Sequence, residues 1–78
     1  MSCLSVAPAS DYRVVLGAAI RQKRKRSGFT QEVLAEKADL HTNYLGRVER
    51  GEEQISLASL RRIAKALGVR VSELVKDI

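Results

Sequence analysis

Residues 30–51 read TQEVLAEKADLHTNYLGRVERG and contain two helical patterns separated by one break. Apolar residues recur at helical spacing on both sides of Asp39, where the periodicity stops. Thr30 is a good N-cap, because its hydroxyl can accept a hydrogen bond from an otherwise unpaired backbone N–H. Gly51 suits the left-handed residue that closes a helix. The pattern therefore predicts two short helices joined by a tight turn.

Each of the two predicted helices has an apolar face and a polar face. The inward residues of the first are Val33, Leu34 and Ala38, and those of the second are Tyr44, Leu45 and Val48. The second helix directs a polar set toward solvent, namely Thr42, Asn43, Gly46, Arg47 and Arg50. Helix, turn and polar helix is the arrangement with which small proteins present side chains to DNA bases.

The polar face of the second helix has the chemistry to read base pairs. Asn43 and Arg47 are four residues apart and share one face of a helix. In the major groove, Asn pairs bidentately with adenine and Arg with guanine, while the methyl group of Thr42 can meet a thymine methyl. The alternative is an ordinary solvated face, which many amphipathic helices have.

Positive charge is concentrated before this motif. The chain has a formal net charge of +5 and a pI near 9.9. Residues 1–28 hold six Lys or Arg against one acid, a net of +5, whereas residues 29–78 hold eight of each sign. Most of the excess lies in RQKRKR at residues 21–26, which is typical of a nucleic-acid binder. Lys25 in this cluster is a candidate contact to the DNA backbone. The alternatives are a solubilising basic face or a membrane-surface helix, and the narrow apolar side of this segment disfavours the latter.

The first ten residues, MSCLSVAPAS, are small and uncharged, and we expect residues 1–10 to form a flexible tail without a signal peptide. No stretch approaches the length of a transmembrane helix, so no membrane partner is expected. Cys3 is the only cysteine, which excludes an internal disulfide and suits a reducing cytoplasm. A redox role and a passive role remain open for Cys3.

The rest of the chain also follows helical periodicity, and no segment alternates like a strand. A first helix is predicted from Ser10 or Asp11 to about Ser27, ended by Gly28, with Val15, Leu16, Ala19 and Ile20 facing inward. A fourth helix is predicted between a Ser56 cap and Gly68, with Leu57, Leu60, Ile63, Ala64 and Leu67 facing inward. Residues 69–78 predict a short fifth helix. We therefore expect an all-α, compact five-helix domain over residues 11–78.

Three segments, TQEVLAEKA, LHTNYLGRVERG and ISLASLRRIAKALGV, resemble the Cro and phage-repressor helix–turn–helix family, also called Xre-like regulators. The second segment followed by ISL also resembles the controller proteins of restriction–modification systems. The resemblance implies a lambda-repressor-like fold and a prokaryotic or phage regulator that acts on the nucleoid in the cytoplasm. Its partner would be double-stranded DNA, with RNA polymerase as a further candidate.

The resemblance also implies a role for individual positions. Gln31 and Arg50 match backbone-contacting positions. His41 stands at the N-cap position of the recognition helix and is a further candidate for a phosphate contact, with weak capping by a solvated ring as the alternative. The base-reading positions of the recognition helix correspond to Thr42, Asn43 and Arg47.

Two further positions match a structural ion pair of the family. Arg24 and Glu49 correspond to a buried pair that ties the first helix to the third, and two unrelated surface charges are the alternative. The sequence departs from the family at Asp39, where Gly is frequent, and at Lys23, where a large apolar residue is usual. We expect strain at the first site, and a snorkelling stem or looser packing at the second.

A helix–turn–helix domain of this size reads few base pairs, so we expect a homodimer on a pseudo-palindromic operator. Half-sites would lie roughly 34 Å apart, one turn of DNA. Val69, Val71 and Ile78 are candidates for the dimer contact, or they complete the monomer core.

An enzyme is disfavoured because the chain has one His, one Cys and no Gly-rich phosphate loop. We expect no catalytic residues, no metal site and no cofactor. The remaining rival is a protein-interaction or antitoxin-type module with the same fold. Such a module should have an acidic or apolar recognition face, whereas this face is polar and basic.

Overall fold

The computed structural model describes residues 11–76, which form five α-helices and no strand. The helices are α1 (Asp11–Arg26), α2 (Gln31–Lys37), α3 (Thr42–Glu49), α4 (Leu57–Leu67) and α5 (Val71–Val75). The predicted all-α, five-helix class is thereby confirmed. The expected tail at residues 1–10 and the role suggested for Ile78 lie outside the described residues.

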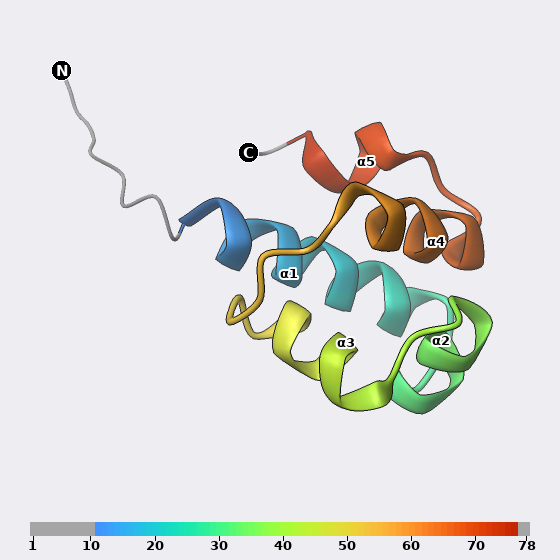
Figure 1. The fold of residues 1–78 in the computed structure, drawn as a ribbon. Coiled ribbons are helices and arrows are strands. Elements are labelled where there is room, and N and C mark those ends of the chain that lie inside the picture. The colour runs from blue at the N-terminus through green and yellow to red at the C-terminus, as the bar shows by residue number, and fades with distance from the viewer. Residues whose placement is uncertain (1–10, 77–78) are drawn as a thin grey trace, which may run out of the picture.

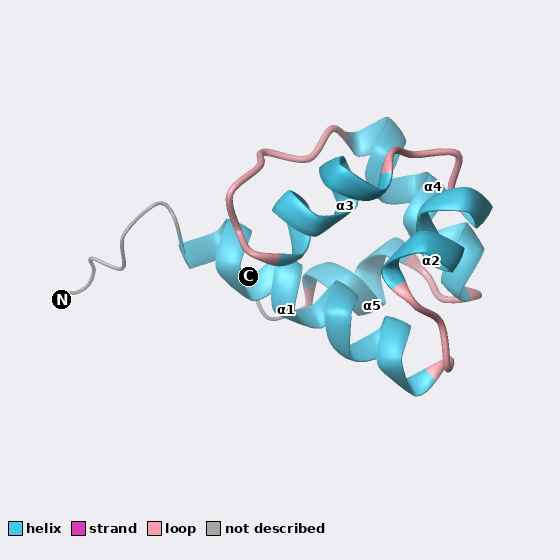
Figure 2. Cartoon of the chain, turned by 90° about the horizontal axis from the view of Figure 1, so that it is seen from below, coloured by secondary structure: helices cyan, strands magenta, loops and turns pink. Residues whose placement is uncertain are grey.

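The longest helix, α1, lies in the middle of the fold (Figure 1). It has α4 and α5 on one side and α3 on the other, and α2 packs against both α3 and α4. The connection from α3 to α4 is the longest loop between described helices, and it passes the first turns of α1 (Figure 2). Within residues 11–76, no helix combines the length and apolar character that crossing a membrane requires.

The two hydroxyl caps and the three glycine helix ends that were predicted are confirmed. The Thr30 hydroxyl accepts a hydrogen bond from the Val33 N–H at 3.1 Å, and the Ser56 hydroxyl accepts one from the Ser59 N–H at 3.1 Å. The three glycines expected to end helices all have positive φ, namely Gly28, Gly51 and Gly68.

The fifth helix begins later than predicted. Gly68 is the left-handed C-cap of α4, and the Val69 N–H then donates back to the Ala64 carbonyl at 3.0 Å. Val69 is therefore part of the end of α4. Arg70 is the N-cap of α5, which starts at Val71.

All five helices contribute to one apolar core. Its fully buried large side chains are Ile20, Leu34, Leu45, Val48, Ile63 and Leu74. Four other residues expected to face inward are only partly buried: Val15, Ala19, Tyr44 and Leu67.

Two predicted core residues are exposed. Val33 lies on the surface, and Leu57 is 67% exposed, so both predictions were wrong. Each residue is in the first turn of its helix, at the edge of the domain. The helical spacing was correct, but no neighbouring element covers these turns.

The two helices α1 and α3 lie close together at Gly17. A Cβ atom built at Gly17 would lie 2.3 Å from the Val48 carbonyl oxygen and 2.7 Å from that of Glu49. A larger residue would push the helices apart, because real Cβ atoms are not found at such distances. Gly17 thus allows α1 to support the C-terminal half of α3 directly.

Candidate nucleic-acid interface

A single left-handed residue sets the direction of α3 relative to α2. Asp39 has a φ of 58°, the only positive φ of a non-glycine among the residues that the structure describes. Its N–H donates to the Glu36 carbonyl at 3.1 Å, and the Leu40 N–H donates to the Ala35 carbonyl at 2.8 Å. Asp adopts this conformation more readily than most residues, so the turn forms without glycine.

The N-terminal end of α3 is exposed. His41 is its N-cap in extended conformation, and its side chain makes no capping hydrogen bond. The first turn begins with Thr42, which is half-buried, and Asn43, which is exposed. The side chains of His41 and Asn43 are therefore open to a ligand.

Three of the predicted DNA-contacting residues line one shallow hollow. It lies beside α3, and its lining is Asp39, Leu40, His41, Asn43, Tyr44, Arg47 and Ser59. Asn43 and Arg47 both project from α3, as their spacing predicted, and His41 lies at its start. The structure thus brings one amide, one guanidinium and one imidazole to a common surface.

Gln31 and Arg50 meet over Gly46. A Cβ atom built at Gly46 would lie 3.2 Å from Arg50 Nη1 and 3.5 Å from Gln31 Oε1. Gly46 is buried, so the expectation that it faces solvent was wrong. Gly46 lies on the polar side of α3 by its helical spacing, but the side chains of Gln31 and Arg50 cover it. The first residue of α2 and the C-cap of α3 are thereby combined in one surface.

A buried ion pair holds the end of α3 against α1. Arg24 Nε donates to Glu49 Oε2 at 2.7 Å, and Arg24 Nη2 donates to Glu49 Oε1 at 3.1 Å. The two side chains are 10% and 2% exposed. Arg24 Nη1 also donates to the Phe29 carbonyl at 2.9 Å, and Gln31 Nε2 donates to Glu49 Oε1 at 3.0 Å. Burial of these charges is therefore compensated by several hydrogen bonds.

Two glutamates that the sequence reasoning missed pair with the exposed arginines of this surface. Arg47 Nε donates to Glu53 Oε2 at 2.9 Å, and Arg50 Nε donates to Glu52 Oε2 at 3.1 Å. The sequence shows the acids close to the arginines, but helical periodicity ends at Gly51. The contacts depend on the path of the loop, which no local pattern predicts.

The basic segment at residues 21–26 is divided by the fold. Arg24 is internal, and Lys23 Nζ lies 3.7 Å from Glu73 Oε2 on α5, with its side chain 25% exposed. Three cations of the segment remain exposed, namely Arg21, Lys25 and Arg26. Lys25 and Arg21 lie on one face of α1, beside Val14 and Ala18.

Comparisons with known proteins agree with the helix-turn-helix arrangement of α2 and α3. A family model described as helix-turn-helix matches residues 20–74. The control protein C.BamHI of Bacillus amyloliquefaciens is 39% identical over 67 residues, which cover 85% of this chain and 83% of that protein.

Two solved structures are also similar. The restriction-modification controller protein C.AhdI from Aeromonas hydrophila has a TM-score of 0.79 and 37% identity, and the match covers 80% of this chain and 94% of that one. The biofilm regulator SinR, solved in complex with DNA, has a TM-score of 0.73 and 35% identity over 76% of this chain and 95% of that one.

Proposed function

We propose that this chain acts as a dimer on a pseudo-palindromic operator. The chain belongs to the helix-turn-helix family of non-enzymatic, DNA-binding transcriptional regulators. The recognition helix α3 would enter the major groove. One observation carries the proposal: Asn43 and Arg47 share an exposed surface on a helix whose C-terminal end is held by the Arg24–Glu49 pair. Such rigid support keeps base-reading side chains in a defined position.

Base reading is assigned to Thr42, Asn43 and Arg47. Asn43 would pair with adenine and Arg47 with guanine, while the Thr42 methyl group would contact a thymine. Both longer side chains are exposed and project from one face of α3, which supports a joint role. Thr42 lies in the same first turn as Asn43.

Backbone contacts are assigned to Gln31, Arg50, His41 and Lys25. A side-chain amide has two N–H donors, so Gln31 can donate to a phosphate while it donates to Glu49. Arg50 lies next to it and supplies positive charge. His41 is exposed at the start of α3, and Lys25 adds charge on α1. Phosphate contacts of this kind fix the orientation of a protein on the duplex.

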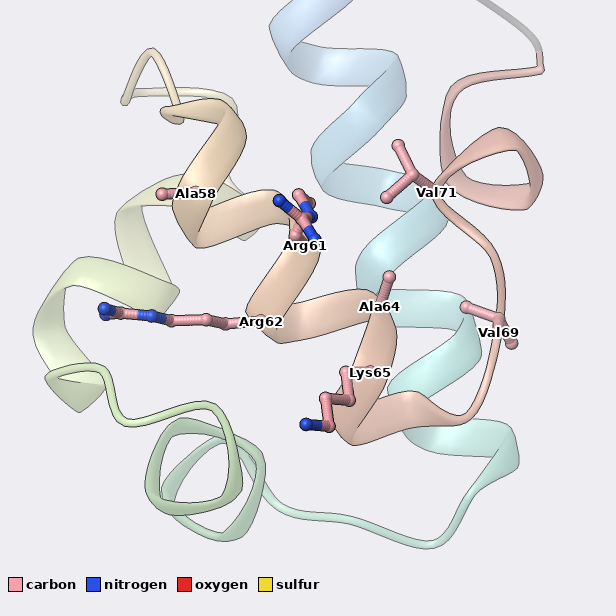
Figure 3. Close-up of a pocket in the computed structure, with 7 residues that line it drawn as sticks. All are labelled: Ala58, Arg61, Arg62, Ala64, Lys65, Val69 and Val71. Carbon is pink, nitrogen blue, oxygen red and sulfur yellow. The ribbon is translucent and has the colours of Figure 1, made fainter.

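The dimer contact is assigned to the apolar end of a groove between α4 and the start of α5. Figure 3 shows Ala64, Val69 and Val71 gathered on the side of α4 that faces this segment, whereas Arg62 extends in another direction. Arg61 and Lys65 line the same groove. Two copies of these cations would repel each other across a two-fold axis, so the contact should centre on Val71.

A bound dimer would act through RNA polymerase, by recruiting it from an upstream site or by blocking it across a promoter. The similarity to bacterial control proteins supports a place on the nucleoid in the cytoplasm.

The half-buried Val69 and Val71 leave apolar surface for the second copy in the proposed dimer.

Selection from a random pool of DNA duplexes tests the proposal. We expect enrichment of sequences with two inverted half-sites whose centres lie roughly one DNA turn, or 34 Å, apart. Affinity for the enriched duplex should fall steeply with added salt, because several phosphates are contacted. Absence of enrichment, with salt-insensitive or no binding, would instead favour a protein-interaction module.

A further inference from the structure

The ion pair between Arg47 and Glu53 lies on the proposed DNA-reading surface. It joins the proposed guanine-reading side chain to the loop that follows α3, with Nε and Oε2 2.9 Å apart. Arg47 is 45% exposed and Glu53 32% exposed. Exposed ion pairs of this kind add little to the stability of the fold. The main effect of the pair is therefore expected on the orientation of the Arg47 side chain rather than on the free energy of unfolding.

Glu53 is hydrogen-bonded to Arg47 through Nε of the guanidinium. An arginine has five N–H donors in a planar fork, and a bidentate contact to guanine uses two of them. A carboxylate at Nε leaves both terminal nitrogens available and restricts rotation of the plane.

The loop that carries Glu53 is itself attached to the end of α3. The Gly51 N–H donates to the Val48 carbonyl at 3.0 Å, and the Glu52 N–H donates to the Arg47 carbonyl at 2.9 Å. A Cβ atom built at Gly51 would lie 2.8 Å from Val14 Cγ2, so the loop also packs closely on α1. Glu53 therefore extends from a backbone with a defined position relative to Arg47.

We propose that Glu53 is a specificity-determining positioning residue, whose carboxylate orients the Arg47 guanidinium toward one base. Its negative charge also disfavours nearby phosphates, so Arg47 gains less from a nonspecific backbone contact. This inference rests on the proposed base-reading role of Arg47. It differs from a simple competition between Glu53 and DNA, which would weaken binding to all sequences equally.

The neighbouring pair provides a matched control. Arg50 Nε lies 3.1 Å from Glu52 Oε2, and both side chains are more than half exposed. Arg50 is assigned to the DNA backbone, where charge matters more than a single orientation. Glu53→Gln and Glu52→Gln remove the same charge from adjacent loop positions, but only the first affects the proposed base reader.

The experiment measures affinity for two duplexes, the one enriched from the random pool and a scrambled duplex of equal composition. Both variants should bind the scrambled duplex more tightly than the unsubstituted chain does. Glu52→Gln should also bind the enriched duplex more tightly by a similar factor, which preserves the ratio of the two affinities. Glu53→Gln should lower that ratio about tenfold, the low end of the discrimination that a bidentate contact provides.

Two further variants separate orientation from charge. Glu53→Asp keeps the charge but shortens the reach, so it should lower the ratio without tighter binding to the scrambled duplex. In a chain with Arg47→Ala, adding Glu53→Gln should leave the ratio unchanged. A further fall in that background would overturn the proposal, because Glu53 would then act without Arg47.

The outcomes distinguish this inference from the proposed function. If the unsubstituted chain fails to discriminate between the duplexes, both are wrong. If it discriminates and Glu53→Gln keeps the full ratio, or changes it no more than Glu52→Gln does, only the positioning role is wrong. Thermal unfolding of each variant verifies that the domain remains folded.

Discussion

Arg24 and Glu49 are 25 positions apart in the sequence, yet two hydrogen bonds join their side chains at 2.7 and 3.1 Å. The pair connects α1 to the end of the proposed recognition helix, and Gln31 of α2 donates to the same carboxylate. One buried cluster thus fixes the relative positions of three helices. Its disruption should affect both stability and DNA binding.

Arg24→Ala should lower the free energy of unfolding by roughly 3–5 kcal/mol, because it leaves the Glu49 carboxylate buried without its partner. Urea denaturation measures this change. Arg21→Ala, at an exposed position of the same helix, should change stability by less than about 0.5 kcal/mol. Equal effects of the two substitutions would show that the buried ion pair contributes nothing particular to the free energy of unfolding.

Gly17→Ala should destabilise the domain by about 1–3 kcal/mol or more, because the added methyl group would overlap the Val48 carbonyl and force α1 away from α3. The midpoint of thermal unfolding measures the effect. Ala18→Ser also adds one non-hydrogen atom, at the exposed neighbouring position, and should leave the midpoint of thermal unfolding almost unchanged. A stable Gly17→Ala variant would contradict the close contact of the two helices.

Arg47→Ala should weaken binding to the enriched duplex by roughly 1–3 kcal/mol and relax the preference at one base position in each half-site. Binding assays on duplexes with single base changes measure both effects. If Arg47→Ala weakened binding to every duplex equally, its assignment to base reading would be wrong.

Lys25→Gln should lower affinity for every duplex and reduce the slope of log affinity against log salt concentration by about 1. Lys76→Gln is the control, since it removes the same charge from the end of α5, on the other side of α1 from α3 (Figure 1). An unchanged slope for Lys25→Gln would show that Lys25 does not contact the DNA backbone.

Val71→Glu should weaken self-association by about tenfold or more, because an unpaired charge would be buried in the proposed dimer contact. Sedimentation over a range of concentrations measures the change. Val33→Glu introduces the same charge at an exposed position of α2, away from this groove, and should leave self-association unaltered. A monomeric unsubstituted chain would exclude the dimer directly.

The sequence predicted those parts of the fold that depend on local chemistry. Thr30 and Ser56 cap their helices because hydroxyl caps act within one turn, and Gly68 ends α4 because of its own backbone freedom. The exposure of Leu57 was not predictable in this way. It depends on whether another element covers the first turn of α4.

The candidate site was predictable to a similar degree. The common face of Asn43 and Arg47 follows from their spacing, and the partners Arg24 and Glu49 came from the family resemblance. The carboxylate of Glu53 beside Arg47 was missed, because it depends on how an irregular loop turns back. The DNA contacts themselves remain predictions that binding experiments must test.

The division of α3 between buried and exposed positions has an evolutionary consequence. Leu45, Val48 and Glu49 are buried, whereas Asn43 and Arg47 are exposed and absent from the core. Substitutions at the exposed positions can therefore accumulate without loss of folding. Under the proposed base-reading role, descendants of such a domain can diverge in target preference while they keep the same framework, so duplicated copies could regulate separate genes without cross-talk.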